Sequence, residues 1–194
     1  MSFEDALRIV RLRGQAMQAA ADASPSGMVA VLGMESEPLQ KVCDEARVDG
    51  GVLRMANFLC PGNIVCSGDT ESCKQLEEAA IAAGAMKAVS LSVAGAFHTS
   101  LMDSAVEKLS EALASVELKA PRVPVVSNVD AEPHTDPNEI RELLAKQVVS
   151  PVRWEDSLRF ILGSGIEELF EIGAGKVLKG TMKRIDRKFP FTNI

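Results

Sequence analysis

Aromatic side chains are scarce in this sequence, which has one tryptophan, seven phenylalanines and no tyrosine in 194 residues. Hydrophobic residues nevertheless make up 46% of the chain, an ordinary share for a globular protein. The core must therefore be built mainly from valine, leucine, isoleucine, alanine and methionine. The length suits one large domain, or a domain with a small inserted lobe.

Long apolar runs and an excess of positive charge are also absent. No apolar stretch approaches the roughly 18–20 residues needed to span a bilayer. The formal net charge is −6, whereas proteins that bind nucleic acid generally present a basic surface. The sequence thus predicts neither a membrane partner nor a nucleic-acid partner.

The spacing of a metal site is missing as well. None of the four cysteines belongs to a CxxC pair, and the chain has only two histidines. The cysteines are Cys43, Cys60, Cys66 and Cys73. We expect free, mostly buried thiols in a reducing compartment, and neither a metal ion nor another cofactor.

Turn-forming residues and hydrophobic periodicity divide the first half of the chain. Ser2 is a candidate N-cap for a first helix, which ends before the Ser-Pro-Ser-Gly segment at 24–27. From there the pattern predicts strand, helix, strand, strand, helix and strand, with a tight turn at Cys60-Pro61-Gly62. This order is the ferredoxin-like pattern. We therefore predict a small subdomain over residues 26–94.

After residue 95, predicted helices alternate with predicted strands. The helices are expected at 100–115, 137–148, 156–163 and from about 175, and the strands at 123–130 and 166–173. Such alternation is typical of an α/β fold with a parallel sheet covered on both faces. Residues 1–25 and 95–194 are thus predicted to form the core around the small subdomain.

The segment VAGAFHTSLM places His98 between the end of a strand and the start of a helix. Side chains there point into the crevice at the carboxyl ends of parallel strands, where α/β proteins hold their ligands. His98 is therefore a candidate catalytic residue.

The same segment is similar to the histidine motif of malonyl and acyl transferases. Further segments resemble that family in the same order, namely ANFLCPGNIVCSG, PRVPVVSNVD, LLAKQVVSPVRW and ELFEIGAGKVLKG. From Phe3 to Arg184 the chain resembles the malonyl-CoA:acyl carrier protein transacylases. Its sequence in these segments is most similar to the plant and algal plastid branch of the family. The resemblance implies an α/β-hydrolase-like acyltransferase core, incomplete at its N-terminus, with the ferredoxin-like insertion. It also implies the plastid stroma, with bacterial cytoplasm as the alternative.

The family's reaction gives each candidate residue a role. A serine attacks the malonyl thioester, while a histidine takes its proton and later returns one to the leaving thiol. The resemblance assigns the histidine role to His98 and the orienting backbone carbonyl to Gln147. It assigns binding of the malonyl carboxylate to Arg13, whose planar guanidinium can donate two parallel hydrogen bonds to that group. Phe97 and Asn57 are expected to line the acyl pocket.

The residue patterns alone leave other interpretations open. Arg8 and Arg11 lie on the same predicted helix as Arg13, and any of the three could be a solvated surface residue. Gln147 could be an exposed helix-end residue, and Phe97 could be a packing aromatic.

A run of basic residues occupies the predicted last helix. Spacings of three and four residues would place them on one side of that helix. The residues are Lys176, Lys179, Lys183 and Arg187. On an acidic protein this stripe could dock the phosphates of coenzyme A or an acidic carrier protein, although a solvated helix surface is the alternative.

The family's nucleophile lies in a glycine-flanked serine elbow, and this chain contains no GxSxG segment. Ser67 and Ser100 lack the flanking glycines of such an elbow. The resemblance places the elbow upstream of the helix that begins near Ser2. We therefore expect this chain to lack the serine and to be inactive alone.

The leading hypothesis is transfer of malonyl from malonyl-CoA to the phosphopantetheine thiol of acyl carrier protein in fatty acid biosynthesis. A polyketide-synthase-type acyltransferase domain is one alternative. The other is a non-catalytic fragment that binds the carrier protein or coenzyme A.

Overall fold

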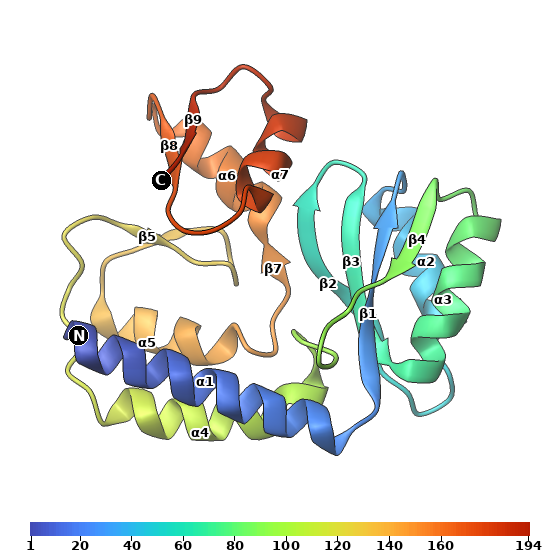
Figure 1. Cartoon of the computed structure of the whole chain (residues 1–194), viewed down its shortest axis with the longest axis horizontal. Coiled ribbons are helices and arrows are strands. Elements are labelled where there is room, and N and C mark those ends of the chain that lie inside the picture. The colour runs from blue at the N-terminus through green and yellow to red at the C-terminus, as the bar shows by residue number, and fades with distance from the viewer.

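The computed structural model describes residues 1–194 as a sheet-containing lobe beside a group of packed helices (Figure 1). The helices are α1 (Phe3–Ala23), α2 (Ser36–Ala46), α3 (Thr70–Ala82), α4 (Asp103–Ala114), α5 (Pro137–Lys146), α6 (Trp154–Gly163) and α7 (Val177–Ile185), with a 3-10 turn η1 (Ser100–Met102) before α4. The strands are β1 (Ser26–Leu32), β2 (Leu53–Cys60), β3 (Asn63–Asp69), β4 (Lys87–Ser90), β5 (Val125–Val126), β6 (Pro133–His134), β7 (Val152–Arg153), β8 (Leu169–Glu171) and β9 (Phe191–Asn193). The predicted α/β class is confirmed.

The sheet of the small lobe has the strand order β4-β1-β3-β2-β7. Its first four strands pair antiparallel in the ferredoxin-like order that the sequence pattern predicted. The fifth strand, β7, comes from outside residues 26–94 and pairs parallel with β2. The sheet thus extends beyond the predicted subdomain, whose boundaries stay a prediction.

Helices α2 and α3 cover one face of this sheet (Figure 1). Leu39 of α2 and Leu76 of α3 are fully buried there against Val29 and Val31 of β1. Asp69 begins α3: its Oδ1 accepts from the Ser72 backbone N–H at 2.9 Å. Because its Oδ2 also accepts from the Val52 N–H at 2.8 Å, the same side chain joins the helix start to the approach to β2.

The helical group is built on α1, α4 and α5, which lie side by side (Figure 1). Ser2 caps α1 as predicted, since its Oγ accepts from the Asp5 N–H at 3.0 Å and donates to the Asp5 carboxylate at 2.8 Å. Further along α1, Met17 packs on Leu109 and Leu113 of α4 in a buried cluster. None of the helices is both long enough and apolar enough to cross a membrane.

Strand pairing outside the small lobe differs in detail from the expected parallel sheet. The strand predicted at 123–130 is reduced to β5, because the chain then turns: the Ala131 N–H donates to Ser127 O at 2.9 Å, and Ala131 has φ 63°. This turn returns the chain as β6, antiparallel to β5. The strand β8 pairs parallel with β9, an element that the sequence patterns did not predict.

Candidate active site

His98 lies in the connection between β4 and η1, with a backbone φ of 64°. A positive φ is uncommon for a residue other than glycine, and such strained residues cluster at functional sites. The conformation is held on both sides. The His98 N–H donates to Val148 O at 3.2 Å, and the buried Thr99 hydroxyl donates to Ala96 O at 2.8 Å. The ring is thus presented from a rigid turn.

Two backbone carbonyls fix the orientation of the His98 ring. Its Nδ1 lies 3.0 Å from Gln147 O and 3.0 Å from Ser150 O. Carbonyl oxygens only accept, so Nδ1 must carry the hydrogen and Nε2 keeps its lone pair. The structure therefore brings His98 and the Gln147 carbonyl together, as the resemblance implied. Ser150 was missed, although the following Pro151 signalled an extended backbone there.

The surroundings of His98 favour its neutral form. Burial has the largest effect and lowers the pKa of His98, and the positive charges of Arg13 and Arg54 lower it further. The hydrogen bonds to the two carbonyls oppose this change, but the net pKa is below the ordinary value. A histidine that is neutral at neutral pH can accept a proton, as a general base must.

Arg13 differs from the other two arginines of α1. Arg8 is exposed and pairs with Asp5 at 3.4 Å, and Arg11 is exposed without an ion pair, whereas Arg13 is half-buried and has no carboxylate partner. Its Nε is buried without a hydrogen-bond partner, and burial lowers the pKa of the group. Buried donors without partners are rare in folded proteins. An unpaired guanidinium whose charge acts on His98 is suited to hold an anion beside the histidine.

A β-bulge between Met55 and Asn57 alters β2 on the sheet face that α2 and α3 leave free. The bulge places Asn57 opposite Val65, whose side chain lies on that free face, so the Asn57 side chain faces the same side. Bulges commonly redirect a side chain next to an active site. The Asn57 Oδ1 is buried without a partner, and so is the hydroxyl of Ser67, two residues beyond Val65 on β3. Asn57 therefore has an unmet acceptor, as a pocket residue could.

Arg54 is a functional candidate that sequence reasoning missed. It is exposed, it stands opposite Ser67 in the β2–β3 register, and its charge acts on His98. The alternation of side chains along β2 was the available signal, but it could not show that this face turns toward His98.

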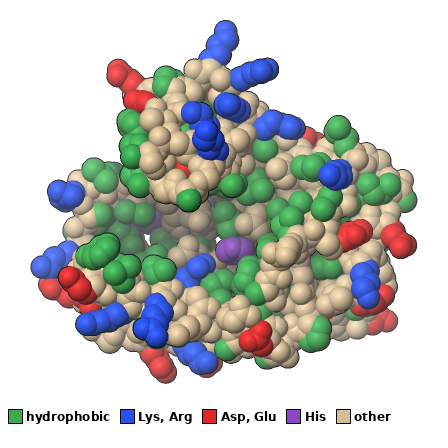
Figure 2. Space-filling view, in the orientation of Figure 1, with side chains coloured by type: hydrophobic (Ala, Val, Ile, Leu, Met, Phe, Trp, Pro, Cys, Tyr) green, Lys and Arg blue, Asp and Glu red, His purple; other side chains and the backbone are tan.

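Phe97 joins the two parts of the molecule. Its ring packs against the α1–α4 cluster and also against Met28, Ala56 and Val65 on the free face of the sheet. This contact supports the packing interpretation of Phe97, and its role in narrowing an acyl pocket stays a prediction. Figure 2 shows the molecule hollowed between its parts, with histidine side chains within the hollow.

The predicted four-residue basic stripe is wrong. Helix α7 runs only over Val177–Ile185, so Lys176 precedes it and Arg187 follows it. The helix ends because Asp186 is extended and its carboxylate accepts from the Lys188 N–H at 2.9 Å. Only Lys179 and Lys183 share one helix face.

The helix begins where it does because of a distant carboxylate. Glu171 of β8 accepts from the Leu178 N–H at 3.0 Å and from the Lys179 N–H at 3.1 Å. These bonds satisfy two N–H groups that have no partner within the helix, and negative charge is favourable at a helix N-terminus.

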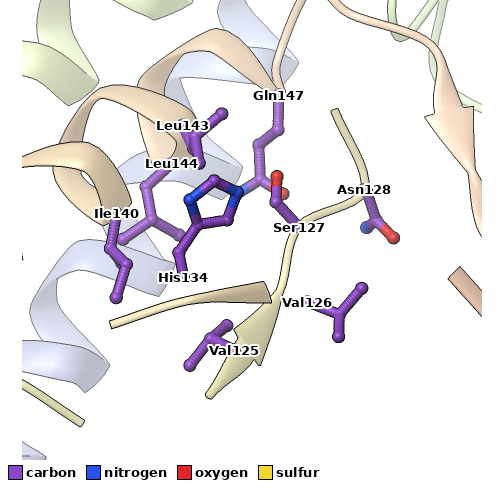
Figure 3. Close-up of a pocket in the computed structure, with 9 residues that line it drawn as sticks. All are labelled: Val125, Val126, Ser127, Asn128, His134, Ile140, Leu143, Leu144 and Gln147. Atoms are coloured by element: carbon purple, nitrogen blue, oxygen red, sulfur yellow. The ribbon is translucent and has the colours of Figure 1, made fainter. Parts of the chain in front are cut away.

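A separate cavity of about 100 Å³ lies between β5 and α5 and is lined by Val126, His134, Leu144 and Gln147, among others (Figure 3). His98 does not line it. The two sites meet at Gln147, whose side chain lines the cavity while its carbonyl bonds His98.

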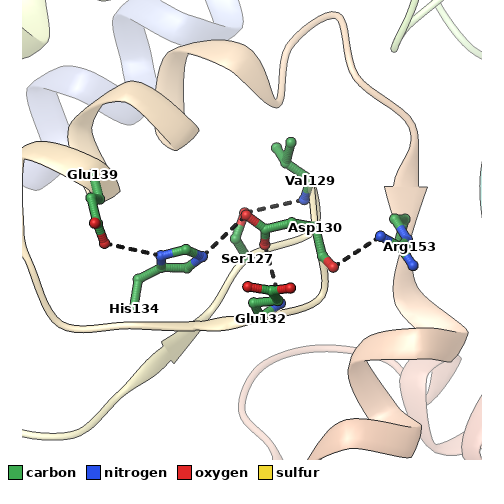
Figure 4. A network of polar contacts seen from close by, with 7 residues as sticks. All are labelled: Ser127, Val129, Asp130, Glu132, His134, Glu139 and Arg153. Carbon is green, nitrogen blue, oxygen red and sulfur yellow. Dashed lines mark hydrogen bonds and ion pairs between the residues drawn. The ribbon is translucent and has the colours of Figure 1, made fainter.

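His134 is held by two carboxylates at this cavity (Figure 4). Its Nε2 lies 3.1 Å from Asp130 Oδ2 and its Nδ1 lies 3.4 Å from Glu139 Oε2. Burial alone would lower the pKa of His134, but the two carboxylates raise it above the ordinary value. Arg153 donates to the Asp130 carbonyl at 3.0 Å, which attaches the β5–β6 turn to β7. The structure has no group of three His, Cys, Asp or Glu side chains able to hold a metal ion.

Comparisons with known proteins all place the chain in one family. A family model described as "Acyl transferase domain" matches residues 1–184. The chain is 42% identical over 188 residues to a malonyl CoA-acyl carrier protein transacylase of Bacillus subtilis, covering 97% of this chain and 59% of that protein. The chain thus spans about three fifths of the length of the curated relatives it matches.

Solved structures agree with these sequence matches. A malonyl-CoA:acyl carrier protein transacylase of Xanthomonas oryzae superposes with a TM-score of 0.94 at 41% identity, covering all of this chain and 61% of that one. A malonyl-transacylase in complex with a type II PKS acyl-carrier protein gives a TM-score of 0.92 at 35% identity, with coverage of 100% and 62%.

Proposed function

The chain belongs to the acyl transferase domain family, and on that premise we propose that it acts in the transfer of malonyl from malonyl-CoA to the phosphopantetheine thiol of acyl carrier protein. The relatives that are called malonyl CoA-acyl carrier protein transacylases support this substrate pair. The observation that carries the proposal is the half-buried, unpaired Arg13, whose positive charge acts on a His98 that is held at Nδ1 by two carbonyls. Acyl carrier protein is the proposed partner, and no cofactor enters the chemistry.

His98 is proposed to move the proton of the reaction. Its free Nε2 takes the proton from an attacking hydroxyl and returns one to the leaving thiol, so the same nitrogen serves both half-reactions. The carbonyls of Gln147 and Ser150 hold the ring in one tautomer and stabilise the positive charge that forms on it. In many serine hydrolases an aspartate has this orienting part.

Arg13 is proposed to select malonyl through its free carboxylate. A guanidinium can form two parallel bonds to that group, and an acetyl group offers no such partner. Isothermal titration should therefore show tighter binding of malonyl-CoA than of acetyl-CoA to the 194-residue chain. Equal affinity for the two thioesters would remove the carboxylate role.

The nucleophilic serine is proposed to lie outside these residues, so that the chain is inactive alone. The chain has no GxSxG segment, and the only hydrogen-bond partners of the His98 ring are the two carbonyls. Intact-protein mass spectrometry after incubation with malonyl-CoA should then show no covalent adduct. A stable malonyl adduct that disappears in His98→Ala would place the nucleophile within the chain and refute this point.

Two further proposals concern docking and location. Lys179 and Lys183, on one face of α7, are candidates for contact with coenzyme A phosphates or an acidic carrier protein. We propose that the protein is located in the plastid stroma, because its ANFLCPGN and VAGAFHTS segments resemble the plastid branch in sequence. The curated relatives named above come from bacteria. Of the alternatives, a polyketide-type transferase is favoured by the likeness to the malonyl-transacylase bound to a type II PKS carrier protein.

A further inference from the structure

Two of the four cysteines meet in the core of the small lobe. The Sγ atoms of Cys43 on α2 and Cys66 on β3 lie 3.5 Å apart, and both side chains are fully buried. They come from different elements and are separated by 23 positions in the chain. The contact is therefore a product of tertiary folding, and the catalytic proposal makes no use of it.

We propose that Cys43 and Cys66 form a redox-active dithiol that closes to a disulfide across the α2–β3 contact. A disulfide has an S–S length of about 2.0 Å, so each sulfur must move by less than about 1 Å from its present position. The oxidant is a small-molecule disulfide. One thiolate attacks it and releases one thiol, and the second thiolate then displaces the other thiol from the mixed disulfide. Two electrons and two protons pass to the oxidant, which becomes two thiols.

The remaining cysteines do not compete for this bond. The Cys73 Sγ donates to Gly27 O at 3.5 Å and to Gly68 O at 3.6 Å, so its thiol is directed to the backbone. Cys60 lies at the other end of the β2–β3 hairpin, beside the turn. Among the four thiols, only those of Cys43 and Cys66 make a sulfur–sulfur contact.

Burial sets the rate of oxidation. The hydrogen bond between Cys66 and Cys43 raises the pKa of the Cys66 thiol, and burial raises it further. Little thiolate is therefore present in the closed lobe. An oxidant reaches the pair only when α2 lifts from the sheet. Helix α2 has no side-chain cap to resist this opening, since Glu35 at the N-cap position makes no side-chain hydrogen bond to the helix. Oxidation should be slow in buffer and faster in urea below the unfolding midpoint.

The disulfide would tie α2 to the central strand of the sheet. The strand β3 pairs with both β1 and β2, and β2 carries Asn57 and Arg54. Such a link reduces the freedom of the unfolded chain and slows the opening of α2. The oxidised protein should therefore melt at a higher temperature than the reduced one, while the His98 contacts stay unchanged.

The test is oxidation of the folded chain with oxidised glutathione, followed by intact mass measurement and then by alkylation and non-reducing peptide mapping. We expect a mass lower by about 2 Da, for the two lost hydrogens, and a linked peptide pair holding Cys43 and Cys66. Trypsin and Glu-C together cut at Glu71, which separates Cys66 from Cys73. The Cys60→Ala variant then removes the remaining ambiguity, because Cys60 and Cys66 share a peptide.

Cys73→Ala is the matched control and should still form the disulfide, whereas Cys43→Ala should not. A linked pair that includes Cys60 or Cys73 would overturn the proposal. So would glutathione adducts alone, or a melting temperature that does not rise on oxidation. The mapping of the unsubstituted chain decides the pairing even if the Cys43→Ala variant fails to fold.

Discussion

Replacing Arg13 by lysine tests the proposed carboxylate site most directly. The substitution keeps one positive charge at a half-buried position of α1 and removes the planar fork. Arg13 has no ion pair that would be broken, and its Nε has no hydrogen-bond partner. The change should therefore act on the bound carboxylate far more than on the fold.

The expected magnitude follows from the number of bonds lost. A guanidinium can give two charge-assisted hydrogen bonds to a carboxylate, and an ammonium at the same place keeps one of them. A hydrogen bond to a charged group contributes about 1.5–3 kcal/mol, and about 1.4 kcal/mol corresponds to a tenfold change in Kd. Arg13→Lys should thus weaken malonyl-CoA binding by roughly 10- to 100-fold, with acetyl-CoA binding nearly unchanged.

The assay is isothermal titration of both thioesters against the variant and against Arg11→Lys. Arg11 is an exposed arginine on the same helix, so it controls for the chemical change itself. Equal weakening for malonyl-CoA and acetyl-CoA would refute the carboxylate role of Arg13. The same conclusion would follow if Arg11→Lys lost as much malonyl-CoA affinity as Arg13→Lys.

Four further outcomes are expected. In an NMR titration, the midpoint of His98 should lie below pH 6.5 and that of His134 above it, because their pKa values are shifted in opposite directions. Two coincident midpoints would contradict this. The contribution of His98 to stability is present above pH 6.5 and is lost as the pH falls through its folded pKa, while that of His134 is present below pH 6.5 and is lost as the pH rises through its folded pKa. In urea unfolding, Asp69→Ala should lower the free energy of unfolding by about 1–2 kcal/mol, and Asp69→Asn, which keeps one of the two acceptor oxygens, should lower it less. Leu109→Ala, at a position 1% exposed, should cost about 2–5 kcal/mol, and a loss below about 1 kcal/mol would show that the α1–α4 cluster is not tightly packed.

Local sequence was sufficient for most elements. The cap at Ser2 and the turn at Gly62 are encoded by residues next to one another, and both occur as predicted. Boundaries were less certain where a distant group decides them. The end of α7 depends on the Asp186 turn and its start on Glu171 of β8, so periodicity alone extended the basic stripe too far in both directions.

The amino-acid sequence by itself determined the family resemblance, the α/β class and the identities of His98, Gln147 and Arg13 as candidates. Only the tertiary structure decided which nitrogen of His98 is free, because that depends on carbonyls 49 and 52 positions away in the chain. It also separated Arg13 from Arg11, since burial and missing partners are properties of packed surfaces and leave no mark on helical spacing.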